Sequence, residues 1–220
     1  SQSNNTAALN EKVLPTLTTV GIASDNANTD GPWATTGDTI TLTFVSDEII
    51  AAPADDATNL VVTFKSGGVA VNASRVSYTN VTGDKINWTA QYDAASGDTE
   101  GNVTFSVAFK DVSGNVGTAE TAVTDSSTVR FDKTAPILNT VRLHTNNSPS
   151  THAKTGRVVT LTIVANDSIS QPVVTFNSGA AALNNASSRT ITYGGSGTTH
   201  TASYITDAND TEGDVTVSID

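Results

Sequence analysis

The chain has 220 residues and a formal net charge of −11, with only 15% charged residues and neither cysteine nor methionine. Without thiols there is no disulfide framework and no thiolate metal site, so a folded domain must rely on core size, bound ions or neighbours. The negative charge argues against nucleic acid and anionic membranes as partners, and no apolar run approaches the roughly 18 residues of a membrane-inserted span. Such a negatively charged chain is expected to attract cations.

Most of the chain is present twice. The repeated segments are EKVLP at 11–15 and DKTAP at 132–136, LVVTF at 60–64 and PVVTF at 172–176, and DTEGNVTFSV at 98–107 and DTEGDVTVSI at 210–219. The offset is 119 residues from Phe44 to Ile163 (163 minus 44) but 112 from Phe64 to Phe176 (176 minus 64), so the first copy carries seven extra residues in between. A period above one hundred residues is typical of a duplicated domain, and we expect repeat 1 at 11–134 and repeat 2 at 135–220.

The two ends of the chain are out of register with this repeat. Residues 1–10 align with the tail of a repeat, whereas repeat 2 stops at Asp220, before the last strand or two that repeat 1 contains. One expectation is that the chain is part of a longer array of such repeats. The other is donor-strand exchange, in which residues 1–10 of one copy complete the open sheet of repeat 2 in an identical subunit and so build a fibre.

Short strands with alternating apolar residues follow one another along both copies. Thr39–Phe44 has a counterpart in Val158–Ile163, and Val103–Phe109 has one that begins at Val215. In each, every second side chain is apolar, which is the period of a half-buried strand, and no stretch of 12 or more residues carries a helical period. About seven such strands per repeat predict an all-β fold of tandem immunoglobulin-like β-sandwiches, the second lacking its last strand or strands within this chain.

Three segments carry a resemblance to a known family. FDKTAP at 131–136, DVSGN at 111–115 and the TGD-plus-strand at 36–43 resemble the tandem immunoglobulin-like domains of large, repetitive bacterial surface proteins and adhesins. The resemblance covers nearly the whole chain. It implies an extracellular or cell-surface spacer that holds a binding tip away from the cell, with neighbouring repeats as partners and calcium at the domain junctions to stiffen the string.

Loop carboxylates are the candidate calcium ligands. They are Asp38, Asp98, Glu100, Asp111 and Asp132. Calcium takes about six to eight oxygen ligands, and a junction between domains can gather them. The alternative is that these aspartates simply form turns, and we favour it for DVSGN; for DTEG the two interpretations stand nearly even, because Glu is a poor turn residue and yet occurs there twice. Arg157 replaces Asp38 in repeat 2, which weakens the case for a site there.

The polar residues do not form the pattern of an enzyme. The histidines His144, His152 and His200 lack metal-ligand spacing, and no serine lies in a G-x-S-x-G motif with suitable partners. Trp33, beside Pro32 in a predicted loop, is the candidate for an exposed binding contact, whereas Trp88 is expected in the core. The sequence therefore predicts a structural or adhesive spacer; the alternatives are a fibre subunit and a module whose loops bind a glycan or a host or cell-surface protein.

Overall fold

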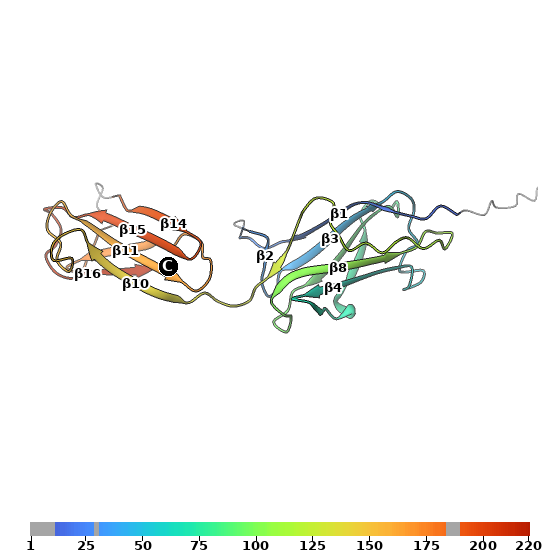
Figure 1. Ribbon diagram of the computed structural model, residues 1–220, viewed down its shortest axis with the longest axis horizontal. Coiled ribbons are helices and arrows are strands. Elements are labelled where there is room, and N and C mark those ends of the chain that lie inside the picture. Colours follow the sequence, from blue (N-terminus) through green and yellow to red (C-terminus); the bar gives the residue numbers. More distant parts are fainter. Residues whose placement is uncertain (1–11, 29–30, 184–189) are drawn as a thin grey trace, which may run out of the picture. The chain divides into compact units, whose positions relative to one another are not determined.

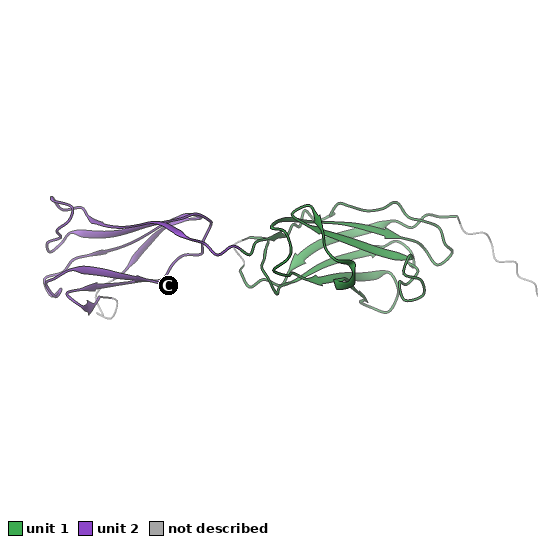
Figure 2. Cartoon of the chain, turned by 90° about the horizontal axis from the view of Figure 1, so that it is seen from below, with its two compact units in different colours: residues 1–133 green, residues 134–220 purple. Residues whose placement is uncertain are grey.

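The structure, a computed structural model, describes residues 12–28, 31–183 and 190–220 (Figure 1). The predicted donor segment, residues 1–10, lies outside this described part. The chain divides into two compact units, residues 1–133 and 134–220 (Figure 2), and each is described by itself. The single helical element in the described residues is the three-residue 3-10 turn η1 (Ala73–Arg75), and no helix there is long and apolar enough to cross a membrane.

Unit 1 folds into two β-sheets. Its strands are β1 (Leu17–Ser24), β2 (Trp33–Ala34), β3 (Thr39–Ser46), β4 (Leu60–Ser66), β5 (Val69–Ala70), β6 (Ser77–Asn80), β7 (Asn87–Asp93), β8 (Gly101–Phe109) and β9 (Arg130–Phe131). One sheet has the order β1-β3-β7-β6 and the other β2-β9-β8-β4-β5. Neighbouring strands are antiparallel except for β2 and β9, which are parallel.

Unit 2 repeats most of this arrangement. Its strands are β10 (Leu138–Thr145), β11 (Val158–Ala165), β12 (Val174–Ser178), β13 (Ala181–Ala182), β14 (Thr192–Ser196), β15 (Thr199–Ile205) and β16 (Val215–Ile219). The sheet orders are β10-β11-β15-β14 and β13-β12-β16, which match β1-β3-β7-β6 and β5-β4-β8 of unit 1. Among the described residues of unit 2, no strand corresponds to β2 or β9.

The apolar side chains of alternate strand residues meet between the sheets and form one core in each unit. On β3, Ile40, Leu42 and Phe44 are fully buried, as the alternation predicts, and their counterparts on β11 are buried as well. Trp88 is 4% exposed, so its predicted place in the core is confirmed. Each core contains an equivalent aromatic pair. The ring centroids of Phe64 and Tyr92 in unit 1 are 4.9 Å apart, and those of Phe176 and Tyr204 in unit 2 are 5.0 Å apart.

A segment without regular strand structure over most of its length closes the sandwich of unit 1. This closing segment, residues 116–131, follows β8 and ends in β9. It runs back along β8 through the bonds Gly117 N–H to Phe109 O (3.1 Å), Glu120 N–H to Val107 O (3.0 Å), Val107 N–H to Glu120 O (2.8 Å) and Val103 N–H to Val129 O (2.8 Å). Midway it reaches the other sheet, where Thr124 N–H donates to Val20 O (2.8 Å) and Ile22 N–H donates to Ser127 Oγ (2.8 Å). The closing segment thus joins the β1 edge to the β8 edge.

Candidate functional site

The predicted calcium ligands fall at opposite ends of β8. Asp38, Asp98, Glu100 and Asp132 belong to loops and a strand end near the start of β8, whereas Asp111 follows its end. Within residues 12–28, 31–183 and 190–220, no group of three or more His, Asp or Glu side chains is arranged to hold a metal ion. The function of each carboxylate is therefore best judged from the bonds that it makes.

Asp98 forms an ion pair with Arg75. The Nη1 of Arg75 lies 2.7 Å from Oδ1 and Nη2 lies 2.9 Å from Oδ2, while Oδ2 also accepts the N–H of Ala95 at 2.8 Å. The side chain of Asp98 is only 9% exposed, and the guanidinium holds the pKa of its carboxyl below the usual range. Arg75 also donates to the carbonyl of Asp93 and lies over the ring of Tyr92, 5.5 Å from its centroid. Asp98 thus ties the loop before β8 to η1.

Glu100 binds the chain where it leaves β9. Its Oε1 accepts the backbone N–H of Lys133 at 2.9 Å. The Nζ of Lys133 in turn donates to the carbonyl oxygens of Ser96 (2.7 Å) and Asp98 (2.9 Å) in the same loop. The glutamate of the DTEG motif, which is unusual for a turn, therefore has a defined structural partner in unit 1.

The other two well-bonded aspartates organise turns. Oδ2 of Asp38 accepts the N–H of Thr35 at 2.6 Å and the side-chain amide of Asn26 at 2.5 Å. Asp111, only 1% exposed, accepts both the N–H (2.8 Å) and the side-chain amide (2.7 Å) of Asn115. Such bonds from an aspartate to nearby backbone are typical of turns. Calcium binding by these residues stays a prediction.

Trp33 was predicted in a loop, but it lies in strand β2. The strand forms because the closing segment pairs with it: Trp33 aligns with Arg130 and Ala34 with Phe131. The indole is half-buried, and the guanidinium carbon of Arg130 lies 5.7 Å from its ring centroid. The sequence did not predict this strand because two residues are too few to show an alternation of apolar and polar side chains. A binding role for Trp33 also stays a prediction.

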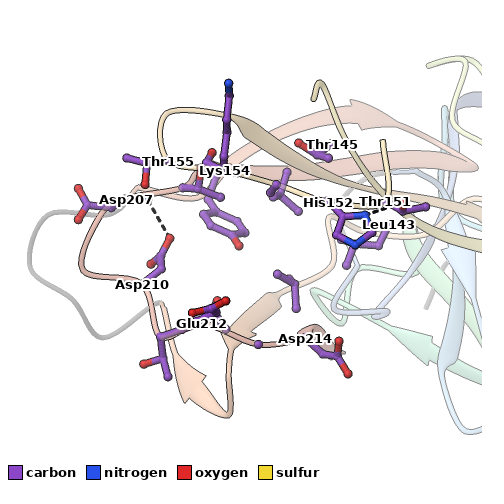
Figure 3. A pocket seen from close by; sticks show the side chains of 18 of the residues that line it. Leu143, Thr145, Thr151, His152, Lys154, Thr155, Asp207, Asp210, Glu212 and Asp214 are labelled. Carbon is purple, nitrogen blue, oxygen red and sulfur yellow. Dashed lines mark hydrogen bonds between the residues drawn. The ribbon is translucent and has the colours of Figure 1, made fainter. Parts of the chain in front are cut away.

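A groove of about 890 Å³ opens at one end of unit 2 (Figure 3). It lies among the end of β10, the loop 150–155 and the loop 206–214. Figure 3 shows Asp210, Glu212 and Asp214 along one side and Leu143 and His152 on the other. The groove was not predicted, because its lining combines residues within 143–155 with residues within 204–216, which are distant in sequence.

The three histidines occupy two different places in unit 2. His144 and His152 both line the groove of unit 2. His200 is 5% exposed, and its Nε2 lies 3.1 Å from the carbonyl oxygens of both Ile169 and Gly197. His200 thus has a structural role within β15. Within the described residues the two groove histidines belong to no three-ligand group.

Comparisons with known proteins concern the fold. No family model and no curated protein matches the chain. Among solved structures it is similar to an I-band fragment of titin (10% identity, TM-score 0.43, 95% of this chain and 65% of that chain), titin domains z1z2 in complex with telethonin (16%, 0.31, 95% of each) and a marsupial T cell receptor (11%, 0.33, 96% and 98%). The chain thus spans about two thirds of that I-band fragment. With its paired sheets, two cores and all-β composition, the chain is a tandem pair of immunoglobulin-like β-sandwiches.

Proposed function

We propose that the chain is a structural spacer, in which immunoglobulin-like units in series extend a larger extracellular or cell-surface protein. The observation that carries the proposal is that each unit has its own core between its own two sheets. The residues that join the units, Lys133 to Pro136, are exposed. A chain of separately folded units connected by a short exposed linker is the architecture that a spacer requires.

The linker sequence supports the same role. Pro136 fixes its own φ angle and disfavours helical geometry at Ala135, which limits the conformations of the joint. The charge of −11 keeps such units soluble and mutually repelling. The resemblance of residues 131–136 and 111–115 to repetitive bacterial surface proteins is the basis for placing the spacer at a cell surface, where it would present an adhesive partner domain.

Calcium at the linker end of unit 1 remains part of the proposal only as a stiffening ion. Glu100 already accepts a bond from Lys133, and Asp98 is paired with Arg75. A calcium ion at this end would have to share these carboxylates with their protein partners. We therefore treat it as an addition to the spacer role, which does not depend on it.

Single-molecule force spectroscopy tests the spacer role. The full chain is held by tags at both ends and stretched. We expect two separate unfolding events, with length gains of roughly 400 Å for unit 1 and 300 Å for unit 2 from the reach of an extended chain. The event of unit 1 should need the higher force, because its closing segment bonds to both sheets. A single joint event, or extension without resistance, would contradict the proposal.

A further inference from the structure

The chain enters and leaves unit 1 at opposite ends of strand β8 (Figure 1). At the entry end, a Cβ on Gly117 would lie 2.7 Å from the carbonyl oxygen of Pro15, and the N–H of Gly117 donates to Phe109 O at the end of β8. At the exit end, the N–H of Lys133 donates to Glu100, directly before β8. Tension carried by the chain therefore pulls unit 1 along the direction of β8.

The closing segment runs parallel to β1. Thr124 N–H donates to Val20 O at 2.8 Å, and Val20 N–H donates to Thr124 Oγ1 at 3.0 Å. Further along β1, Ile22 N–H donates to Ser127 Oγ at 2.8 Å. Because β1 is the edge strand of its sheet, these two hydroxyl groups accept N–H groups for which the sheet itself offers no neighbouring strand.

Strand β9 continues in this direction beside β2, with which it pairs in parallel. Arg130 N–H donates to Pro32 O at 2.7 Å, and Asp132 N–H donates to Ala34 O at 2.8 Å. Bonds of this kind are evenly spaced along a parallel pair. We call these two bonds, together with the bonds of the closing segment to β1, the parallel contacts.

The hydroxyl group of Ser127 is held in the orientation that this bonding needs. Asp125 Oδ1 accepts the N–H of Ser127 at 2.9 Å, and the Ser127 hydroxyl also donates to this carboxylate, which lowers the pKa of Asp125. The lone pairs of the hydroxyl are then left for the N–H of Ile22. A Cβ on Gly21 would lie 2.5 Å from Asp125 Oδ2, so glycine at this position leaves room for the carboxylate against β1.

The direction of these strands decides how tension reaches the bonds. The chain pulls β1 towards the entry end and the closing segment towards the exit end, so the two slide along one another. In this direction the parallel contacts are loaded together and must break at nearly the same time. Peeling the closing segment from one end would instead load them one after another. Forced unfolding depends on the unfolding rate, which is set by bonds that stay intact until the transition state.

We propose that the parallel contacts form a mechanical clamp, which gives unit 1 a directional resistance to tension along the chain. The hydroxyl groups of Thr124 and Ser127 are its central elements, because they join the closing segment to β1. The resistance is high when the chain ends are pulled apart and low when the closing segment is peeled away from its exit end. The proposal deepens the spacer role and rests on it.

Two pulling directions on the full chain test the clamp. In the first, tags at both chain ends load the parallel contacts together. In the second, a Gly97→Cys handle and the C-terminal tag peel the closing segment, because the carbonyl oxygens of the neighbouring Ser96 and Asp98 bind Lys133 Nζ. The chain has no other cysteine, and a Cβ on Gly97 would meet no atom within 4 Å.

The force of unit 1 should be about twofold or more higher in the first direction than in the second. The two events are recognised by their length gains. End-to-end pulling extends the whole of unit 1, whereas peeling releases only the 36 residues between positions 97 and 133 (133 minus 97), or roughly 120 Å.

Paired variants locate the clamp. Thr124→Val combined with Ser127→Ala removes both hydroxyl acceptors that face β1. Loss of a bond worth about 1 kcal/mol raises the unfolding rate about fivefold, so end-to-end pulling at constant force should show a rise of about 25-fold. Peeling should change by less than about threefold, because it breaks the contacts beside Lys133 first. Thr79→Val combined with Ser77→Ala, on the exposed positions of β6, is the matched control and should leave both rates unchanged.

Two results would overturn the clamp. One is an equal unfolding force in the two pulling directions, and the other is an equal change of rate in the clamp and control variants. If the clamp variant is unfolded without load by circular dichroism, the comparison of the two directions decides alone, since it leaves Thr124 and Ser127 intact. Either failure still leaves the two separate unfolding events expected of a spacer. A single joint event would overturn both proposals, so the two failures are distinguishable.

Discussion

The two units contain the same strands around similar cores but differ in how their edges are closed. Val20 on β1 is fully buried, whereas Val141 on β10 is 48% exposed. The inward-facing Val103, Phe105, Val107 and Phe109 of β8 are at most 8% exposed, whereas the inward-facing residues of β16 are only half-buried. Because the strands themselves correspond, the difference comes from the closing segment that unit 1 has and the described part of unit 2 lacks. Burial of both edges in this fold therefore depends on one long segment.

The comparison also separates local from long-range structure. The DTEG loop has the same glycine contact and the same serine bond in both units, although in unit 1 it binds Lys133 and in unit 2 it borders an open groove. The loop thus takes its shape from its own sequence and from β4 or β12. Its role as an acceptor of the closing segment comes from its position.

The largest effect is expected when unit 1 loses the anchor of its closing segment. Phe131→Ala removes a fully buried ring and should destabilise unit 1 by about 3–5 kcal/mol, which lowers its unfolding midpoint by about 10 °C or more. Differential scanning calorimetry of the full chain measures it. Val141→Ala, at the exposed edge of unit 2, is the control and should shift its unit by less than about 2 °C. Equal shifts would mean that the closing segment does not set the difference.

The converse change should stabilise unit 2. In this variant a copy of residues 108–133 follows directly after Ile219. Ile219 corresponds to Val107 of unit 1 at the offset of 112, so the copy supplies unit 2 with a closing segment at the same place as in unit 1. Burial of the β10 and β16 edges should raise the stability of unit 2 by about 2 kcal/mol or more. Hydrogen exchange should show new protection of the amides of β16, while a copy with Phe131→Asp serves as the control. Unchanged exchange would show that the groove cannot accept this segment.

Acid should remove the stabilisation that the Arg75–Asp98 ion pair gives to unit 1. The Arg75 guanidinium lowers the folded-state pKa of Asp98, so its contribution is complete above the unfolded pKa near 4 and is lost as pH falls through the lower folded value. Asp98→Asn should cost about 1–3 kcal/mol at pH 7 and progressively less towards pH 2. Chemical unfolding at several pH values measures it, with the exposed Asp55→Asn as control. A pH-independent cost would exclude the ion pair as the cause.

The smallest effect is expected from calcium. Asp98 and Glu100 already accept hydrogen bonds from protein donors. A site with a dissociation constant of about 20 µM would stabilise unit 1 by roughly 2.7 kcal/mol in 2 mM calcium, which is about 100 times that constant. We expect the stabilisation by 2 mM calcium, relative to EDTA, to be smaller than this. Thermal unfolding with a magnesium control measures the shift. A rise of several degrees with calcium alone would instead support an ion at the linker end and would make unit 1 differ from unit 2 in one more respect.

The sequence by itself determined the all-β class, the duplication and the buried face of the main strands. These follow from local periodicity: in Thr39–Phe44, alternate apolar residues can be buried on one side only. The recurrence of DTEG likewise indicated a shared loop.

Only the tertiary structure decided how the edges are closed and what the loop carboxylates bind. The closing segment is rich in Ser and Thr and crosses between sheets, so it has no sustained alternation to recognise. Glu100 meets Lys133 across 33 residues, and Asp98 meets Arg75 across 23. Ile50, in the loop that carries the extra residues of repeat 1, is fully buried in the core of unit 1, and its N–H bonds to Lys85 O. Pairings of this kind depend on which strands the fold brings together, and no local pattern encodes them.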